Sequence, residues 1–186
     1  MTYRNGTYIA FDGLGQTDPI LSDFKYYGAI QAWTANKNMD FKYVNSHDKT
    51  CAVRDSSLRT TLEARIRERQ SNSKNMVVIL SSDTRKTGSM LTYEIEKAVD
   101  YYKIPLIIAY VDYQVVAKPV KLSKYWPEAL RSRIENGTAK AIHIPFTKDA
   151  ILKSVEQFNV YNMPVTAMDN YSKADHRTFG TLGSAG

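Results

Sequence analysis

The chain of 186 residues has the length of one ordinary domain and falls short of two. Hydrophobic residues make up 43% and charged residues 24%, a globular balance that excludes disorder for most of the chain. Lysine and arginine (25 residues) exceed aspartate and glutamate (19 residues), and the resulting net charge of +6 favours polyanionic or phosphorylated ligands.

Several classes of protein are excluded by the sequence. The longest apolar runs, residues 76–80 and 104–111, fall far short of the ~20 residues that cross a bilayer. The first residues lead directly into strand-like sequence, so we expect no signal peptide, no membrane contact and a cytoplasmic protein. The single cysteine, Cys51, excludes an internal disulfide, and three histidines without suitably spaced partners argue against a metal site.

The predicted elements alternate between strands and helices along the chain. Residues 8–11 form a short apolar strand that an Asp-Gly pair ends. Asp18 followed by Pro19 is typical of a helix start and predicts a helix to about residue 36. The remaining predicted elements, in chain order, are a strand at 41–44, a basic helix at 54–74, a strand at 76–80, a helix at 88–102, a strand at 104–111, a short helix after 126–127, a strand at 139–146 and a helix at 148–158.

Five strands that are each followed by a helix predict a parallel sheet with helices on both faces, because parallel neighbours need crossover connections. We therefore expect a three-layer, flavodoxin-like α/β domain with a five-stranded parallel sheet over residues 1–158. Residues 159–186 show no sustained period and are predicted to form a C-terminal tail. In an open parallel sheet the ligand site lies beyond the carboxyl ends of the strands.

The helix predicted over 54–74 is basic, with Arg59, Arg65, Arg67, Arg69 and Lys74 against Glu63 and Glu68. Such a run most often forms a solvated helix face. A nucleic-acid surface is the alternative, and steep salt dependence of DNA or RNA binding would reveal it. No aromatic residues are interleaved with the basic run for base stacking, so we do not expect a nucleic-acid partner.

Glu94 is the most informative carboxylate in the sequence. At about 100° per residue, the apolar positions of its helix form one stripe, made of Leu91, Ile95, Ala98, Val99 and Tyr102. Glu94 falls on the flank of this stripe, close to the carboxyl end of the third strand, where a carboxylate can face the ligand crevice. The alternative is an acid at a helix start, favoured by the helix macrodipole or paired with a basic residue.

The residues that follow the first and third strands exclude two other classes of α/β protein. Asp12 follows the first strand and forms either a turn with Gly13 or a ligand contact. Residues 13–15 lack the third glycine of the dinucleotide fingerprint, and no acidic residue closes the second strand, so a Rossmann site is excluded. Ser81 follows the third strand, where a receiver domain needs its phosphoryl-accepting aspartate, so a receiver is excluded as well.

Other candidates come from the second strand, its loop and the first helix. His47 and Asp48 close the second strand, where a lone histidine is more often a loop hydrogen-bonding group than an acid or base. Arg54 belongs to a helix-capping sequence and could also grip a phosphate. Trp33 gives the first helix a second apolar face, which packs under the polar loop, meets another subunit or walls a pocket. Cys51 has no triad partners, so nucleophilic catalysis is not expected.

In their order and spacing, these segments resemble a known family, the bacterial TIR-like proteins related to the Thoeris antiphage sensor. The matching segments are YIAFDG at 8–13, NSHD at 45–48, RDSS at 54–57, RIRER at 65–69 with Ser71 and Ser73, VVIL at 77–80, and YEIEKA at 93–98. No single segment is specific, but the set is. The resemblance covers residues 8–158 and leaves the tail outside it.

The resemblance implies a TIR-type flavodoxin-like fold and cleavage of NAD at the nicotinamide-ribose bond, with NAD as substrate and no separate cofactor. It implies an ADP-ribose-derived signal that activates a downstream effector, and it leaves self-association open. Glu94 matches the essential acid of TIR enzymes. Phe11 and Asp12 would line the nicotinamide end, and the loop from His47 to Arg54 would close over the nucleotide. The candidate substrate-binding residues are Phe11, Asp12, Trp33, His47, Asp48, Arg54 and Ser81.

One position departs from the family pattern. Relatives often carry a tryptophan three residues before the glutamate, where this chain has Leu91, so the pocket wall differs. Two readings of function follow from the resemblance. The first is an NAD-consuming signalling enzyme. The second is a non-catalytic TIR-like module that acts by self-association or by binding a partner, which assembly without loss of NAD would reveal.

Overall fold

The structure is a computed structural model, and it describes residues 4–15, 23–35, 43–44 and 57–179. Within these ranges the strands form one six-stranded sheet in the order β2-β1-β3-β4-β5-β6, and all neighbours are parallel. The strands are β1 (Gly6–Ala10), β2 (Tyr43–Val44), β3 (Ser73–Leu80), β4 (Leu106–Tyr110), β5 (Ala141–Pro145) and β6 (Asp169–Asn170). The predicted flavodoxin-like parallel fold is confirmed, and β6 adds a short strand to the five expected.

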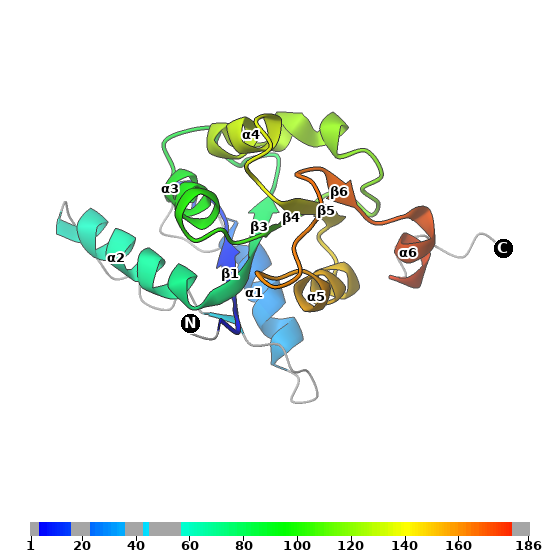
Figure 1. Cartoon of the computed structure of the whole chain (residues 1–186), viewed down its shortest axis with the longest axis horizontal. Helices are drawn as coiled ribbons and strands as arrows, with labels where there is room; N and C mark the ends of the chain where they lie inside the picture. Colours follow the sequence, from blue (N-terminus) through cyan, green and yellow to red (C-terminus); the bar gives the residue numbers. More distant parts are fainter. Residues whose placement is uncertain (1–3, 16–22, 36–42, 45–56, 180–186) are drawn as a thin grey trace.

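Helices cover both faces of the sheet and complete the three layers (Figure 1). Their bounds are α1 (Phe24–Thr34), α2 (Ser57–Ser71), α3 (Met90–Glu96), α4 (Glu128–Glu135), α5 (Lys148–Gln157) and α6 (Lys173–Thr178). Residues of α2, α3 and α4 share one buried cluster, and residues of α1 and α5 share the other. No helix in these ranges is both long and apolar enough to cross a membrane.

The side-chain alternation of the strands sends apolar residues to both helical layers. Tyr8 and Ala10 of β1 belong to the cluster beneath α2, α3 and α4, whereas Ile9 and Phe11 belong to the cluster beneath α1 and α5. Every residue of β1 is buried. Because both faces of a parallel sheet are covered, its strands read as continuous apolar runs, which is why the sequence predicted them.

The helix predicted over residues 88–102 is divided in the structure. The α-helix α3 passes into a π-helical segment, η3 (Lys97–Tyr101), in which the Tyr102 N–H donates to the Lys97 carbonyl at 3.0 Å. Ala98 and Val99 stay buried on the same side as Leu91. The apolar stripe therefore continues from the α-helix into the π-helical segment. Because the stripe is continuous, the spacing of apolar residues did not reveal the change of helix type.

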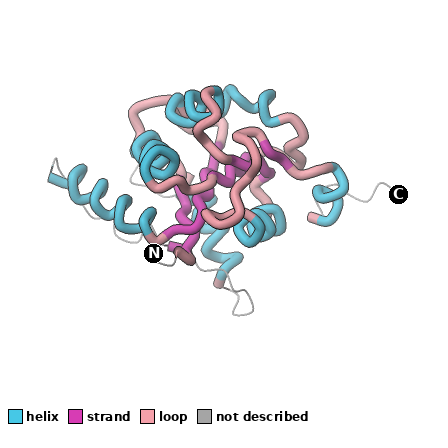
Figure 2. The backbone as a smooth tube through the Cα atoms, viewed as in Figure 1, coloured by secondary structure: helices cyan, strands magenta, loops and turns pink. Residues whose placement is uncertain are grey.

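The segment beyond residue 158, which the sequence predicts to be a tail, packs against the domain as far as residue 179. It enters along a loop after α5 (Figure 2), and β6 then pairs with β5 in parallel. Tyr171 and Phe179 join the buried cluster beneath α1 and α5. A two-residue strand and a six-residue helix leave no hydrophobic period to detect. The domain boundary at residue 158 stays a prediction.

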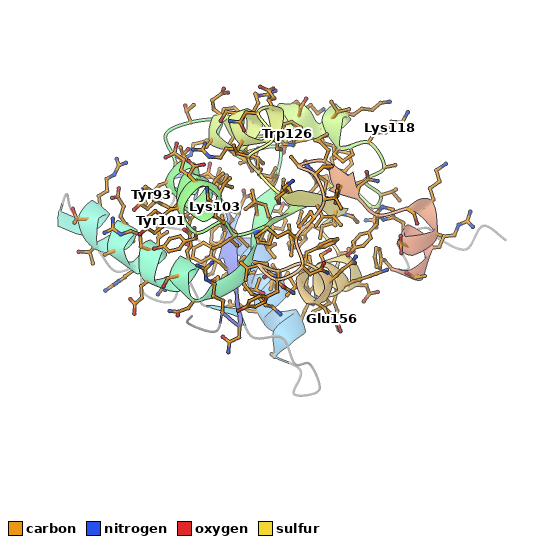
Figure 3. The ribbon with its side chains drawn as sticks, viewed as in Figure 1. Tyr93, Tyr101, Lys103, Lys118, Trp126 and Glu156 are labelled. Atoms are coloured by element: carbon orange, nitrogen blue, oxygen red, sulfur yellow. The ribbon has the colours of Figure 1, made fainter. Side chains whose placement is uncertain are left out.

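A directed chain of hydrogen bonds fixes this segment to the sheet. The His143 Nε2 lies 2.9 Å from the Ala167 carbonyl, which can only accept, so Nε2 carries the proton. Nδ1 then accepts from the Tyr110 hydroxyl at 2.8 Å, and that hydroxyl accepts from the indole of Trp126, labelled in Figure 3, at 2.7 Å. Burial lowers the pKa of His143 to about 4, so this neutral arrangement persists at physiological pH.

Candidate active site

A cavity opens at the topological switch point of the sheet. The chain leaves β1 for the edge strand β2 and then returns to β3 on the other side of β1, so the connections diverge between β1 and β3. The cavity adjoins β1, α2 and α3 and holds about 200 Å³. One water occupies roughly 30 Å³ in the liquid, so a ligand group of ring size fits.

Glu94 supplies the buried carboxyl of this cavity. Leu91 and Ile95 face the sheet, and the intervening Glu94 follows them inward, with only 3% of its surface exposed. The Tyr8 hydroxyl donates to its Oε1 at 2.5 Å, and the Gln70 side chain donates to its backbone carbonyl at 2.8 Å. Burial raises the pKa of Glu94 to about 8, which the Tyr8 hydrogen bond opposes. The carboxyl is therefore mostly protonated at neutral pH in the unliganded fold.

One wall of the cavity is a single face of α2. Leu62, Arg65, Ile66 and Arg69 line it, and they follow the i, i+3, i+4, i+7 spacing of one helix face. Ile66 is buried, whereas the two arginines are partly buried beside it. Arg65 and Arg69 are thus part of the cavity wall, so the solvated face that was expected accounts for only part of the basic helix.

Asp12 and Arg85 form an ion pair at the cavity. The Arg85 Nε and Nη2 donate to Asp12 at 2.7–3.1 Å, and the backbone N–H groups of Arg85 and Leu14 donate at 2.8 and 2.9 Å. Burial alone would raise the pKa of Asp12, but these hydrogen bonds outweigh it and lower the pKa. Asp12 is therefore an ionised, fixed anchor of the site.

The remaining lining is largely apolar. Phe11 and Gly13 follow β1, and Met90 and Leu91 begin α3. The Phe11 ring stacks on Tyr27 of α1, with centroids 5.7 Å apart, which holds the end of β1 in place. An apolar lining with two carboxyls of opposite protonation is an arrangement suited to acid-base or electrostatic chemistry.

The family model of the Thoeris protein ThsB, TIR-like domain, matches residues 8–116, more than half of the 186 residues. The chain belongs to this family. The matched range begins at Tyr8 and contains every residue that lines the cavity. The resemblance to the Thoeris TIR-like family is thereby confirmed, and membership indicates TIR-like signalling in antiphage defence.

The cavity of this Thoeris TIR-like domain brings together three of the predicted site residues. Glu94, Phe11 and Asp12 all line it, although the first is 82 positions from the last. Ser81 lies elsewhere at the same edge of the sheet. Its hydroxyl donates to Asp23 at 2.9 and 3.1 Å, just before α1, and it does not line the cavity. Burial raises the pKa of Asp23 to about 6, against the effect of the Ser81 hydrogen bond.

Trp33 of the TIR-like domain is not brought to the cavity. It lies on α1, whose buried residues belong to the opposite face of the sheet from Glu94. Its ring packs on Phe146, just after β5, with centroids 5.4 Å apart, and Tyr26 contacts the same ring at 5.6 Å. Contact with Phe146 thus explains the second apolar face of this helix. His47, Asp48 and Arg54, with Cys51, lie outside the described residues.

Four residues that line the cavity of this TIR-like domain were not among the predicted site residues: Tyr8, Arg65, Arg69 and Arg85. The sequence could have indicated the two α2 arginines, because Arg65 and Arg69 share one helix face with the apolar Leu62 and Ile66. Tyr8 reads as one more apolar position of a buried strand. Arg85 is 73 residues from its partner, and no local pattern signals that contact.

Replacing Tyr8 with Phe is expected to raise the pKa of Glu94 by about one unit above its wild-type value. The hydroxyl stabilises the ionised carboxylate, and a hydrogen bond to a charged group is worth roughly 1.5 kcal/mol or more. NMR titration of protein labelled with ¹³C-glutamate checks this, with the Glu94 signal assigned through Glu94→Gln. Tyr27→Phe, a buried tyrosine on the other sheet face, is the control. An unchanged or lower midpoint in Tyr8→Phe would contradict the role assigned to the hydroxyl.

Proposed function

We propose that this TIR-like domain cleaves NAD at the nicotinamide-ribose bond and makes an ADP-ribose-derived signal in antiphage defence. One observation carries the proposal. The carboxyl of Glu94, at the position that the family resemblance gives to the essential acid, is buried in a cavity at the switch point of the sheet and is held there by Tyr8.

The chemistry follows from the charge that develops on the ribose. As the C1′–N bond breaks, its electron pair leaves with nicotinamide, and the ribose becomes oxocarbenium-like. A carboxylate fixed beside that carbon stabilises the cation electrostatically, because it needs no reorganisation when the charge appears. Water or a nucleophile of the nucleotide itself then bonds to C1′.

The raised pKa of Glu94 supports a role for the substrate in activating the acid. The nicotinamide ring of NAD is cationic, and a nearby positive charge favours the ionised form of a carboxyl. Entry of the ring into the cavity is therefore expected to lower the pKa of Glu94 from about 8 and leave the carboxylate ready for bond cleavage. Glu94 is itself buried, so this attraction is less screened than it would be in water.

Incubation of NAD with the purified protein tests the proposal, both in buffer and in lysate of phage-infected cells. Nicotinamide and every nucleotide product are separated by chromatography and quantified. We expect nicotinamide to appear in equal amounts with an ADP-ribose-derived product that switches on an effector. Absence of nicotinamide under both conditions, together with concentration-dependent assembly, would instead support a non-catalytic module.

A further inference from the structure

Among the residues that the structure describes, the cavity lining carries more positive than negative charge. Arg65, Arg69 and Arg85 stand against the two carboxyls of Asp12 and Glu94. Asp12 is fully engaged with Arg85, and Glu94 is mostly protonated at neutral pH in the unliganded fold. Among the described residues of the lining, the positive charge without an ion pair is that of Arg65, on the α2 wall. A wall of this kind attracts an anionic part of a ligand, not the cationic nicotinamide ring.

Arg65 differs from its basic neighbours on α2. Arg59 pairs with Glu63 at 3.0 Å, and Arg67 points out of the cavity and donates to the Tyr93 hydroxyl at 3.4 Å (Figure 3 labels Tyr93). Arg65 forms no ion pair with any residue that the structure describes, although it is partly buried in the cavity wall. A cation that is partly withdrawn from water and has no ion pair among the described residues is suited to an anion brought by a ligand.

Arg65 and Arg69 are also spaced for more than one phosphate. Residues four apart on a helix lie one above the other, with Cβ atoms about 6 Å apart. Two guanidinium groups at this spacing can each offer a planar fork of donors to phosphate oxygens. Arg69 has further contacts of its own, so Arg65 is the residue on which the assignment depends.

We propose that Arg65, supported by Arg69, binds the pyrophosphate of the nucleotide on the α2 wall while the cleaved bond lies at Glu94. The assignment rests on the proposed function, because it takes an NAD-derived nucleotide as the ligand. It also orients that ligand: the nicotinamide ribose lies toward β1 and α3, and the phosphates lie along α2.

Calorimetric titration with ADP-ribose tests this site without requiring catalysis. Arg65→Gln is expected to weaken ADP-ribose binding about tenfold to a hundredfold, the loss typical of a charge-assisted hydrogen bond. Arg67→Gln, on the exposed side of the same helix, is expected to bind like the wild type. Adenosine, which has no phosphate, should bind wild type and Arg65→Gln equally.

The outcomes separate this proposal from the proposed function. Wild-type affinity in Arg65→Gln, an equal loss in Arg67→Gln, or no saturable ADP-ribose binding to the wild type would overturn the phosphate site. Glu94→Gln is expected to retain Arg65-dependent binding of ADP-ribose. A wild-type protein that binds ADP-ribose through Arg65 but releases no nicotinamide would contradict only the proposed function.

Discussion

Glu94→Gln is expected to reduce nicotinamide release from NAD by at least about 10²- to 10³-fold, the loss that follows removal of one fixed electrostatic stabiliser. Glutamine keeps the shape of the protonated carboxyl, and its carbonyl oxygen can still accept from Tyr8. It cannot become an anion beside the ribose cation. The fold should therefore persist while the chemistry is lost, which chromatography of NAD reaction mixtures and thermal melting measure together.

Glu96→Gln is the matched control for this experiment. Glu96 lies two residues further along α3, with 44% of its side chain exposed, and it forms an ion pair with Arg133 at 4.0 Å. It removes one carboxylate from the same helix without touching the cavity. Turnover should match the wild type. Equal turnover by wild type and Glu94→Gln, with both proteins folded, would refute the assignment of Glu94.

The second large effect is a pH-dependent difference in stability between wild type and Glu94→Gln. The pKa of Glu94 is 4.5 in its ordinary state and about 8 in the fold. Between these values the folded protein binds one more proton than the unfolded chain, so the free energy of unfolding falls as pH rises. The wild type should lose about 1.36 kcal/mol per pH unit relative to the variant, on the order of 5 kcal/mol over the whole window.

Urea unfolding of both proteins from about pH 3.5 to 9 measures this difference. Other titrating groups, including Asp23, contribute equally to both proteins and cancel when the curves are subtracted. The subtracted curve should be flat below pH 4.5, fall through the window and level off above pH 8. A flat curve throughout would show that Glu94 has its ordinary pKa in the fold. That result would contradict the protonated, buried carboxyl assigned to the cavity.

Local pattern predicted the fold and one end of the site. Apolar runs, and alternation at residues 41–44, identified the five strands, and the apolar stripe of α3 placed Glu94 beside the buried face. The cavity itself is assembled by contacts that no local pattern encodes, such as Asp12 with Arg85 across 73 residues. Trp33 shows the same limit, because two apolar helix faces predict two packing partners but not that Phe146 is one of them.

Short elements escaped prediction for a different reason. β6 and α6 contain two and six residues, too few for a hydrophobic period to repeat. Their positions depend on contacts with distant residues, such as the pairing of β6 with β5 and the packing of Tyr171 and Phe179 in the buried cluster. The capping box of Ser172 and Asp175 was the one local signal of a helix start in this stretch.

The hydrogen-bond chain through His143 determines how far the protein can be truncated from its C-terminal end. A chain that ended at residue 158 would lack Ala167 and β6, leaving the His143 Nε2 without its acceptor and one side of β5 without a partner strand. An uncovered strand edge pairs readily with other chains. Shortened versions of this protein should therefore end after Phe179, and those ending at residue 158 are expected to aggregate, although the family match itself stops at residue 116.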